Sequence, residues 1–262
     1  MSGWRFPEWL AWRRQSEEAG KRMRLGQAST PAGMRIYAIG DVHGMDRLLA
    51  ETHAKIAADL AARPSPDHRI VHVGDYVDRG PDSAGVIERL AGLQARDPRV
   101  VCLLGNHDEL MRAFLADPER GGADWLTNGA RATLRSYGID ATGALTAAEF
   151  RRLGDQLTAA LPDHHRAFLD GLRLSARAGD FFFCHAGIRP GVPLDEQTPE
   201  DLIWIREPFL TSRRDHGVVV VHGHTPVQAP EVRPNRIDID TGAVYGGPLT
   251  VLALEEAQYR FL

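Results

Sequence analysis

The chain has 262 residues, enough for one large domain or for a domain with a helical insertion. Its apolar content of 43% and charged content of 25% are those of an ordinary globular protein, and a net charge of −4 gives no general reason to expect a nucleic-acid or membrane partner. No apolar run approaches the roughly 20 residues that span a bilayer, and the N-terminus lacks the apolar core of a secretory signal. We therefore expect a cytoplasmic protein without stable membrane insertion. Cys102 and Cys184 lie in apolar, strand-like runs, which favours buried free thiols over a disulfide.

Residues 1–33 differ in composition from the remainder. Aromatic residues from Trp4 to Trp12 are followed by basic residues from Arg13 to Arg24. A basic helix with tryptophans could lie on a membrane surface, but an arm that packs its aromatics on the domain is the favoured interpretation. Residues 27–33, with Ser, Thr, Pro and Gly, are typical of a linker.

Three strand–loop–helix units follow. The predicted strands cover residues 34–39, 69–73 and 99–104, and the predicted helices cover residues 48–60, 83–95 and a segment ending near residue 116. Successive units of this kind imply parallel strands joined by right-handed crossovers. All three loops should therefore emerge at one edge of a sheet, where open α/β sheets build their sites.

Residues 117–178 are rich in Ala, Arg and Leu and predict a helical cap inserted between strands, although helices packed simply against the sheet would fit the same sequence. The predicted helices lie near residues 124–137, 146–160 and 163–171, and the later strands at residues 181–184, 218–221, 236–239 and 249–254. The last two strands, with glycine-rich turns between them, look like a hairpin or a meander. Parallel units first and antiparallel strands later predict an α/β fold of two facing sheets flanked by helices.

Polar side chains suited to metal binding gather at five strand ends. They are Asp41 and His43; Asp75, Asp78 and Arg79; Asn106 and His107; His185; and His222 and His224. Carboxylates, imidazoles and an amide oxygen suit Mn, Fe, Zn or Mg rather than copper in a thiolate site. A single such histidine is most often a core or surface residue, but five clusters with the same glycine-flanked form indicate a shared metal site.

These motifs resemble those of the calcineurin-like metallophosphoesterases. Within them they are similar to the phosphoprotein phosphatase branch, near bacterial serine/threonine protein phosphatases and the bacteriophage lambda phosphatase. The matching motifs are Gly-Asp-Val-His-Gly (40–44), Gly-Asp-Tyr-Val-Asp-Arg-Gly (74–80), Gly-Asn-His-Asp (105–108), His-Ala-Gly (185–187) and Gly-His-Thr-Pro (223–226). The resemblance implies the αββα double-sheet sandwich of that family, with residues 34–262 as the catalytic domain and residues 117–178 as its helical cap insertion.

The resemblance also implies two divalent metal ions, manganese first and iron, zinc or magnesium otherwise. By resemblance, Asp41 and His43 would hold one ion, Asn106, His185 and His224 would hold the other, and Asp75 would bridge both. A metal ion lowers the pKa of bound water from 15.7 to about 7, which supplies the hydroxide that phosphate-ester hydrolysis needs. His222, close to the ligands, is expected to be structural or to support them.

The remaining motif residues would act on the substrate. By resemblance, His107 would be the general acid with Asp78 orienting it, Arg79 and Arg206 would bind the phosphate, and Tyr245 would contact the substrate. A strongly basic leaving alkoxide needs such an acid, which contributes roughly 10²–10⁴-fold. Arginines pair with phosphoryl oxygens and stabilise their charge.

Two residues narrow the range of substrates that the resemblance implies. Pro226 stands where many metallophosphoesterases outside this branch have a second histidine, and Asp78 stands where the symmetrical dinucleoside-tetraphosphate hydrolases usually have alanine. We therefore expect a phosphomonoesterase that hydrolyses phosphoserine and phosphothreonine in proteins by in-line attack of a metal-bound hydroxide. The alternative is a symmetrical dinucleoside tetraphosphate or small phosphate-ester hydrolase. A catalytically idle phosphate-binding module is disfavoured because no ligand is missing.

Overall fold

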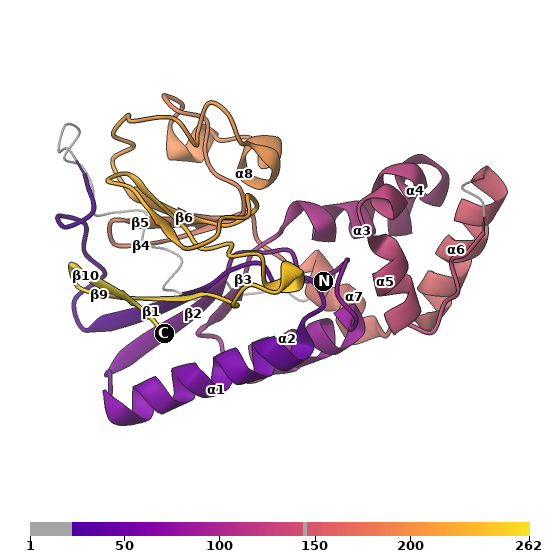
Figure 1. The fold of residues 1–262 in the computed structure, drawn as a ribbon, viewed down its shortest axis with the longest axis horizontal. Coiled ribbons are helices and arrows are strands. Elements are labelled where there is room, and N and C mark those ends of the chain that lie inside the picture. Colours follow the sequence, from indigo (N-terminus) through magenta and orange to yellow (C-terminus); the bar gives the residue numbers. More distant parts are fainter. Residues whose placement is uncertain (1–22, 144–145) are drawn as a thin grey trace, which may run out of the picture.

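The computed structural model describes residues 23–143 and 146–262, and the aromatic and basic segment predicted at the start of the chain lies almost entirely outside them. Two five-stranded sheets face each other (Figure 1). The first has the order β10-β9-β1-β2-β3, with strands Gln258–Phe261, Val251–Glu255, Met34–Ile39, Asp67–His72 and Val100–Cys102. The second has the order β4-β5-β6-β8-β7, with strands Ser175–Ala178, Phe181–Cys184, Val219–His222, Arg236–Asp238 and Glu231–Val232. This arrangement confirms the predicted α/β class with two facing sheets.

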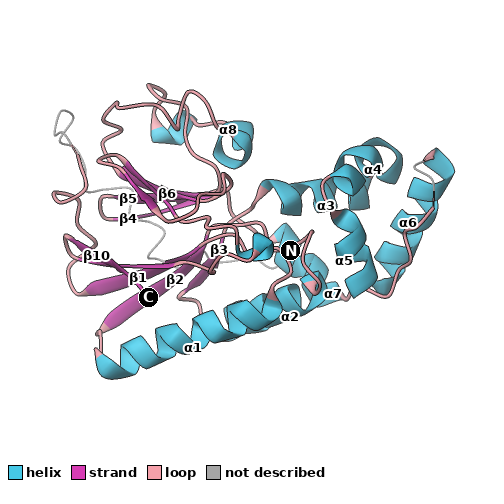
Figure 2. Cartoon of the chain, viewed as in Figure 1, coloured by secondary structure: helices cyan, strands magenta, loops and turns pink. Residues whose placement is uncertain are grey.

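Helices cover both outer faces of the pair of sheets. The helices are α1 (Asp46–Ala62), α2 (Ser83–Arg96), α3 (Asn106–Ala116), α4 (Pro118–Thr127), α5 (Ala130–Ser136), α6 (Ala147–Ala160), α7 (Asp163–Asp170) and α8 (Pro199–Trp204). Helices α1 and α2 lie on the first sheet, α8 lies on the second, and α3 to α6 extend beyond the ends of the sheets (Figure 2). Among the described helices, none is long and apolar enough to cross a membrane.

Alternation along the strands builds the core on both faces of the first sheet. In β1, Ile36 and Ala38 point into the apolar layer between the sheets, whereas Tyr37 and Ile39 point toward α1 and α2. Cys102 and Cys184 are both buried and free, as predicted. The residues predicted as linker are anchored to the core: Ala28 is buried between the sheets, and the Thr30 hydroxyl donates to the Met34 carbonyl at 2.9 Å.

The three predicted strand–loop–helix units are confirmed. β1 pairs with β2 in parallel, with Ile39 beside His72, and β2 pairs with β3 in parallel, with His72 beside Cys102. Because the strands end in register, the loops that follow them emerge at one edge of the first sheet. β5 and β6 of the second sheet also end there, and this edge holds the candidate site.

The prediction of a terminal hairpin or meander is wrong. β8 pairs with β6 and β7 in the second sheet, whereas β9 pairs with β1 and β10 in the first, so residues 239–250 cross from one sheet to the other. The later strands are also not simply antiparallel, because β5, β6 and β8 pair in parallel. Two short apolar runs separated by glycines fit a hairpin and a crossing equally well, and only distant partners decide between them.

The cap range also differs in detail. The single helix predicted near residues 124–137 is two helices, α4 and α5, separated at Asn128 and Gly129. Gly129 has a φ of 105°, a left-handed conformation that favours glycine. Its carbonyl accepts a hydrogen bond from the Arg79 N–H at 3.3 Å, so the break in the helix places the cap against the candidate site.

Candidate metal centre

The predicted ligands come together at the shared edge of the two sheets. Asp41 and His43 follow β1, Asp75 follows β2, His185 follows β5, and His224 follows β6. Asn106 and His107 follow β3, but they form the first turn of α3 rather than the loop that the sequence predicts. All seven side chains are buried, with at most 6% of each residue exposed. The site is therefore shared by both sheets.

The loops that carry these residues have an unusual backbone. Six described non-glycine residues have a positive φ, and five of them are His43 (44°), Asp75 (53°), Asp78 (74°), Arg79 (67°) and His224 (68°). Each such conformation costs of the order of 1–3 kcal/mol and persists only where the surroundings impose it. Backbone strain is therefore concentrated at this one place, which is typical of a functional site.

Asp75 lies at the middle of the cluster. Its Oδ2 atom is 3.4 Å from His43 Nε2, and its Oδ1 atom is 3.4 Å from His185 Nε2. It belongs to two groups whose ligand atoms lie within 4.8 Å of one another, one with His43 and His107 and one with Asp41 and His185. Its two oxygens therefore face two different sets of ligands, an arrangement that suits a carboxylate bridging two ions.

The other side of the cluster is built around Asn106. Its Oδ1 atom lies 2.9 Å from His185 Nε2 and 2.8 Å from His224 Nδ1. The amide oxygen thus sits between two imidazoles, and carboxylate, amide and imidazole donors converge within one buried volume.

Hydrogen bonds hold His43 and His185 in a form that can bind metal through Nε2. His43 Nδ1 lies 2.8 Å from the Val77 carbonyl, and His185 Nδ1 lies 3.1 Å from the Val73 carbonyl. Each Nδ1 can donate only if it carries the proton, which leaves the lone pair on Nε2 facing Asp75. Burial lowers the pKa of His43 to about 3 and also lowers the pKa of His185, so both imidazoles are neutral at pH 7.

The charge balance of the site fits bound cations. Asp41 Oδ1 and His224 Nε2 are buried and have no hydrogen-bond partner. Burial, together with the carboxylates of Asp240 and Asp75, raises the pKa of Asp41 well above its usual range. Divalent ions would compensate this buried negative charge and would occupy the two free ligand atoms. Asp240 was not predicted as a site residue, although it follows β8 much as Asp41 follows β1.

His107 forms a dyad with Asp78. Its Nδ1 atom lies 2.7 Å from Asp78 Oδ2, and its Nε2 atom lies 2.7 Å from the Arg79 guanidinium. Arg79 also reaches His43 Nε2, at 2.6 Å. The Arg79 guanidinium therefore contacts both His107, the predicted acid, and His43, a predicted metal ligand. In this position it can meet a phosphoryl group.

Two supports for this dyad come from the cap and were not predicted. Trp125 of α4 donates its indole N–H to Asp78, and the Thr133 hydroxyl of α5 donates to Asp78 Oδ1 at 2.7 Å. Nothing local in the sequence marks these residues, because they approach Asp78 only through tertiary packing.

Asp108 is a further organising residue. Its carboxylate accepts the backbone N–H groups of Asp75, Tyr76 and Gly105, at 2.9, 2.9 and 3.0 Å. It therefore ties the loop after β2 to the start of α3. An acidic residue in the first turn of a helix is a sequence signal for such a role.

The remaining predicted residues lie at the rim. Arg206 is exposed, and its charge adds to the burial that lowers the pKa of His224 to about 3. Tyr245 is 67% exposed, with its ring 5.9 Å from Arg79 Cζ. His222 is fully buried, and its described hydrogen-bond partners are Gly223 and Arg236 rather than metal ligands.

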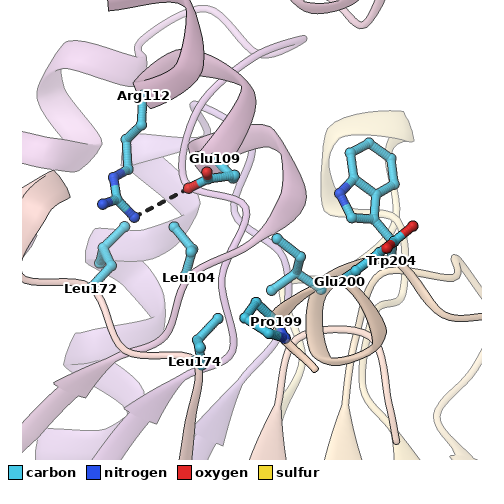
Figure 3. A pocket seen from close by; sticks show the side chains of 9 residues that line it. Leu104, Glu109, Arg112, Leu172, Leu174, Pro199, Glu200 and Trp204 are labelled. Carbon is cyan, nitrogen blue, oxygen red and sulfur yellow. Dashed lines mark hydrogen bonds and ion pairs between the residues drawn. The ribbon is translucent and has the colours of Figure 1, made fainter. Parts of the chain in front are cut away.

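A groove opens beside the candidate metal centre. Its volume is about 800 Å³, and it lies between α3 and α8 (Figure 3). Trp204, 38% exposed, stands at one end of the groove, with its ring 6.1 Å from that of His224. Leu104, Leu172 and Leu174 form the apolar floor, while Glu109 and Arg112 are paired on α3 at 3.1 Å.

Comparison with known proteins supports one family. The model of the calcineurin-like phosphoesterase family matches residues 34–257. A symmetrical bis(5'-nucleosyl)-tetraphosphatase of Nitrosospira multiformis is 28% identical over 273 residues, covering 85% of this chain and 94% of that protein. The asymmetrical bis(5'-nucleosyl)-tetraphosphatase PrpE of Oceanobacillus iheyensis is 29% identical over 246 residues, covering 86% of this chain and 91% of that protein.

Solved structures show the same fold at low identity. A candidate diadenosine tetraphosphatase superposes with a TM-score of 0.57 at 21% identity, covering 90% of this chain and 97% of that one. The cold-active protein-tyrosine phosphatase of a Shewanella species superposes with a TM-score of 0.56 at 17% identity, covering 95% and 88%. These two likenesses concern the fold alone.

Proposed function

Because the chain belongs to the calcineurin-like phosphoesterase family, we propose that it is a two-metal hydrolase of bis(5'-nucleosyl) tetraphosphates. The family makes the chain a phosphoesterase, and the choice of substrate is our inference. It reverses the order of the two functions predicted from the sequence, because the named relatives are tetraphosphatases. Asp78 argued only against the symmetrical enzymes, and the relatives include asymmetrical ones.

The observation that carries the proposal is the pair of exposed aromatic rings at the rim. Trp204 lies beside His224, and Tyr245 lies beside Arg79. Such rings are platforms for nucleobases, with stacking that contributes roughly 1–3 kcal/mol per base. A tetraphosphate with a nucleoside at each end can use two such platforms.

The groove next to Trp204 suits one of these nucleosides. Its volume of about 800 Å³ is in the range of small-molecule sites. The side chains of Glu109 and Glu200 border its apolar floor (Figure 3). Their carboxylates can accept hydrogen bonds from the amino group of a base.

Each group of residues at the site would have its own role in the reaction. Two divalent ions bound here would supply Lewis-acid chemistry and would lower the pKa of the attacking water. Asp41, His43, Asp75, Asn106, His185 and His224 would hold them, with manganese as the first choice among divalent ions and iron, zinc or magnesium as the others. Arg79 would leave both His43 and His107 and pair with phosphoryl oxygens, which frees Nε2 of His107 to carry a proton. His107, oriented by Asp78, would donate a proton to the departing oxygen.

A second candidate function is the hydrolysis of phosphoserine and phosphothreonine. The buried Asp78–His107 dyad favours it, with 2.7 Å between Oδ2 and Nδ1. An alkoxide is a poor leaving group unless it is protonated, whereas a departing phosphate is much less basic. A strong acid dyad therefore contributes more to a monoester than to an anhydride.

One experiment separates the two candidates. Purified protein with Mn²⁺ is given diadenosine tetraphosphate or a phosphothreonine peptide, and kcat/KM is measured for each. We expect the higher value for diadenosine tetraphosphate. Its products, two ADP or ATP plus AMP, identify symmetrical or asymmetrical cleavage. A higher kcat/KM for the phosphopeptide would overturn the proposal.

A further inference from the structure

A second cluster of metal-binding side chains lies away from the catalytic centre, where α7 packs on α2. Glu88 of α2 faces His164 and His165, two consecutive residues in the first turn of α7. Their Nε2 atoms lie 2.7 and 2.9 Å from the same oxygen, Glu88 Oε2. Within residues 23–143 and 146–262, no other group of three such ligands lacks Asp75.

The three ligand atoms can enclose an ion after a small movement. They lie within 4.8 Å of one another, and the two imidazole rings are 4.5 Å apart at an angle of 76°. Zinc bonds to nitrogen and oxygen are about 2.0–2.2 Å, which places tetrahedral ligand atoms about 3.3 Å apart. The side chains of Glu88 (63% exposed) and His164 (55% exposed) have room to open to that distance, whereas His165 (4%) is held in place.

His165 also has the support that metal-binding histidines have. Its Nδ1 atom lies 2.9 Å from the hydroxyl of Tyr137, the residue that ends α5. Without metal, Nε2–H donates to Glu88 and Nδ1 accepts from the hydroxyl. With an ion on Nε2, the proton moves to Nδ1, which then donates to the hydroxyl oxygen. A tyrosine hydroxyl serves both forms, and partners of this kind orient metal-binding imidazoles.

We propose that Glu88, His164 and His165 form a third divalent-cation site, separate from the catalytic pair and independent of the proposed substrate. Two imidazoles and one carboxylate favour Zn²⁺ and other late first-row ions over Mg²⁺ or Ca²⁺. Three protein ligands leave the fourth position to water. The ion joins a cap helix to the catalytic unit, because α2 follows the loop of Asp78 directly.

The test counts bound Zn²⁺ by equilibrium dialysis of protein without an affinity tag. The double variant H164N/H165N should bind one Zn²⁺ fewer than the wild type. The same difference of one should appear in the Asp75→Asn background, where the catalytic centre is impaired. His68→Asn, which changes a histidine outside both clusters, should lose none. An equal Zn²⁺ count with and without His164 and His165 would overturn the site.

Two milder variants keep the test valid if the double variant folds poorly. Glu88→Gln preserves the shape of the side chain but removes a charged ligand. It should weaken Zn²⁺ binding at this site by more than the 10–100-fold that is typical when a residue supporting a metal ligand is lost. Tyr137→Phe should weaken it by about 10–100-fold. Zn²⁺ should raise the Tm of the Asp75→Asn protein, and Glu88→Gln should abolish that rise. An unchanged Zn²⁺ affinity in Glu88→Gln would mean that the three side chains make only a hydrogen-bonded cluster.

Discussion

Trp125 donates its indole N–H to both carboxylate oxygens of Asp78, each 3.1 Å from Nε1. The tryptophan belongs to the cap helix α4, and Asp78 belongs to the loop after β2. Asp78 is fully buried, so its orientation toward His107 depends on protein donors such as this indole. Helix α4 is therefore part of the candidate site, because it holds the carboxylate that orients the candidate acid.

Replacing Trp125 with phenylalanine should lower both stability and turnover. The change keeps an aromatic ring but removes the donor from a buried carboxylate, which costs about 1–3 kcal/mol. Urea unfolding should show that loss, and kcat should fall more than KM changes. Thr127→Val is the control, because Thr127 is exposed on the same helix and bonds only to backbone carbonyls. Equal kcat values for the wild type and Trp125→Phe would show that the indole N–H does not contribute to turnover.

Replacing His107 with asparagine should affect substrates according to their leaving groups. A general acid contributes roughly 10²–10⁴-fold, and most where the departing oxygen is most basic. We expect a loss of that size for an alkyl phosphate such as phosphothreonine, with KM little changed. The loss should be clearly smaller for p-nitrophenyl phosphate, which has a weakly basic leaving group. Identical losses for the two substrates would contradict proton donation by His107.

Replacing Asp75 with asparagine should remove both catalytic metal ions together. Its two oxygens face His43 and His185, in two different ligand sets, so the substitution weakens both. Metal analysis should show the loss of two equivalents, and hydrolysis should fall below detection. Glu51→Gln, at an exposed position of α1, should keep the wild-type content. Retention of both equivalents in Asp75→Asn would refute the bridging role.

Stability should fall as the pH drops from 7 to 5, in part because of His53. Burial lowers the pKa of this residue to about 4, from 6.5. The unfolded chain therefore binds more protons between these two values, so stabilisation is complete above pH 6.5 and is lost as the pH falls toward 4. His53 alone should cost about 2 kcal/mol between pH 7 and pH 5. Urea unfolding at both pH values should show a smaller fall in the free energy of unfolding for His53→Asn than for the wild type. An equal fall in the two proteins would show that His53 does not cause it.

Local pattern predicted much of the fold. Strand periodicity and glycine-flanked loops identified β1, β2 and β3, and the order of the units predicted their parallel pairing. Pairing between distant strands was not predictable in the same way. The runs around Ile237 and Leu252 look alike in sequence, yet they belong to different sheets because each finds its partner elsewhere in the chain.

The candidate ligands were accessible from the sequence because each follows a strand within a short motif. The sequence by itself determined which side chains meet at the edge of the sheets, since parallel strands deliver their loops to one place. Only the tertiary structure decided what holds those side chains. Trp125 and Thr133 reach Asp78 from the cap, and Glu88 meets two histidines of α7, through contacts that no local pattern encodes. Such contacts depend on how helices pack, which is set by the burial of apolar surface across the whole chain.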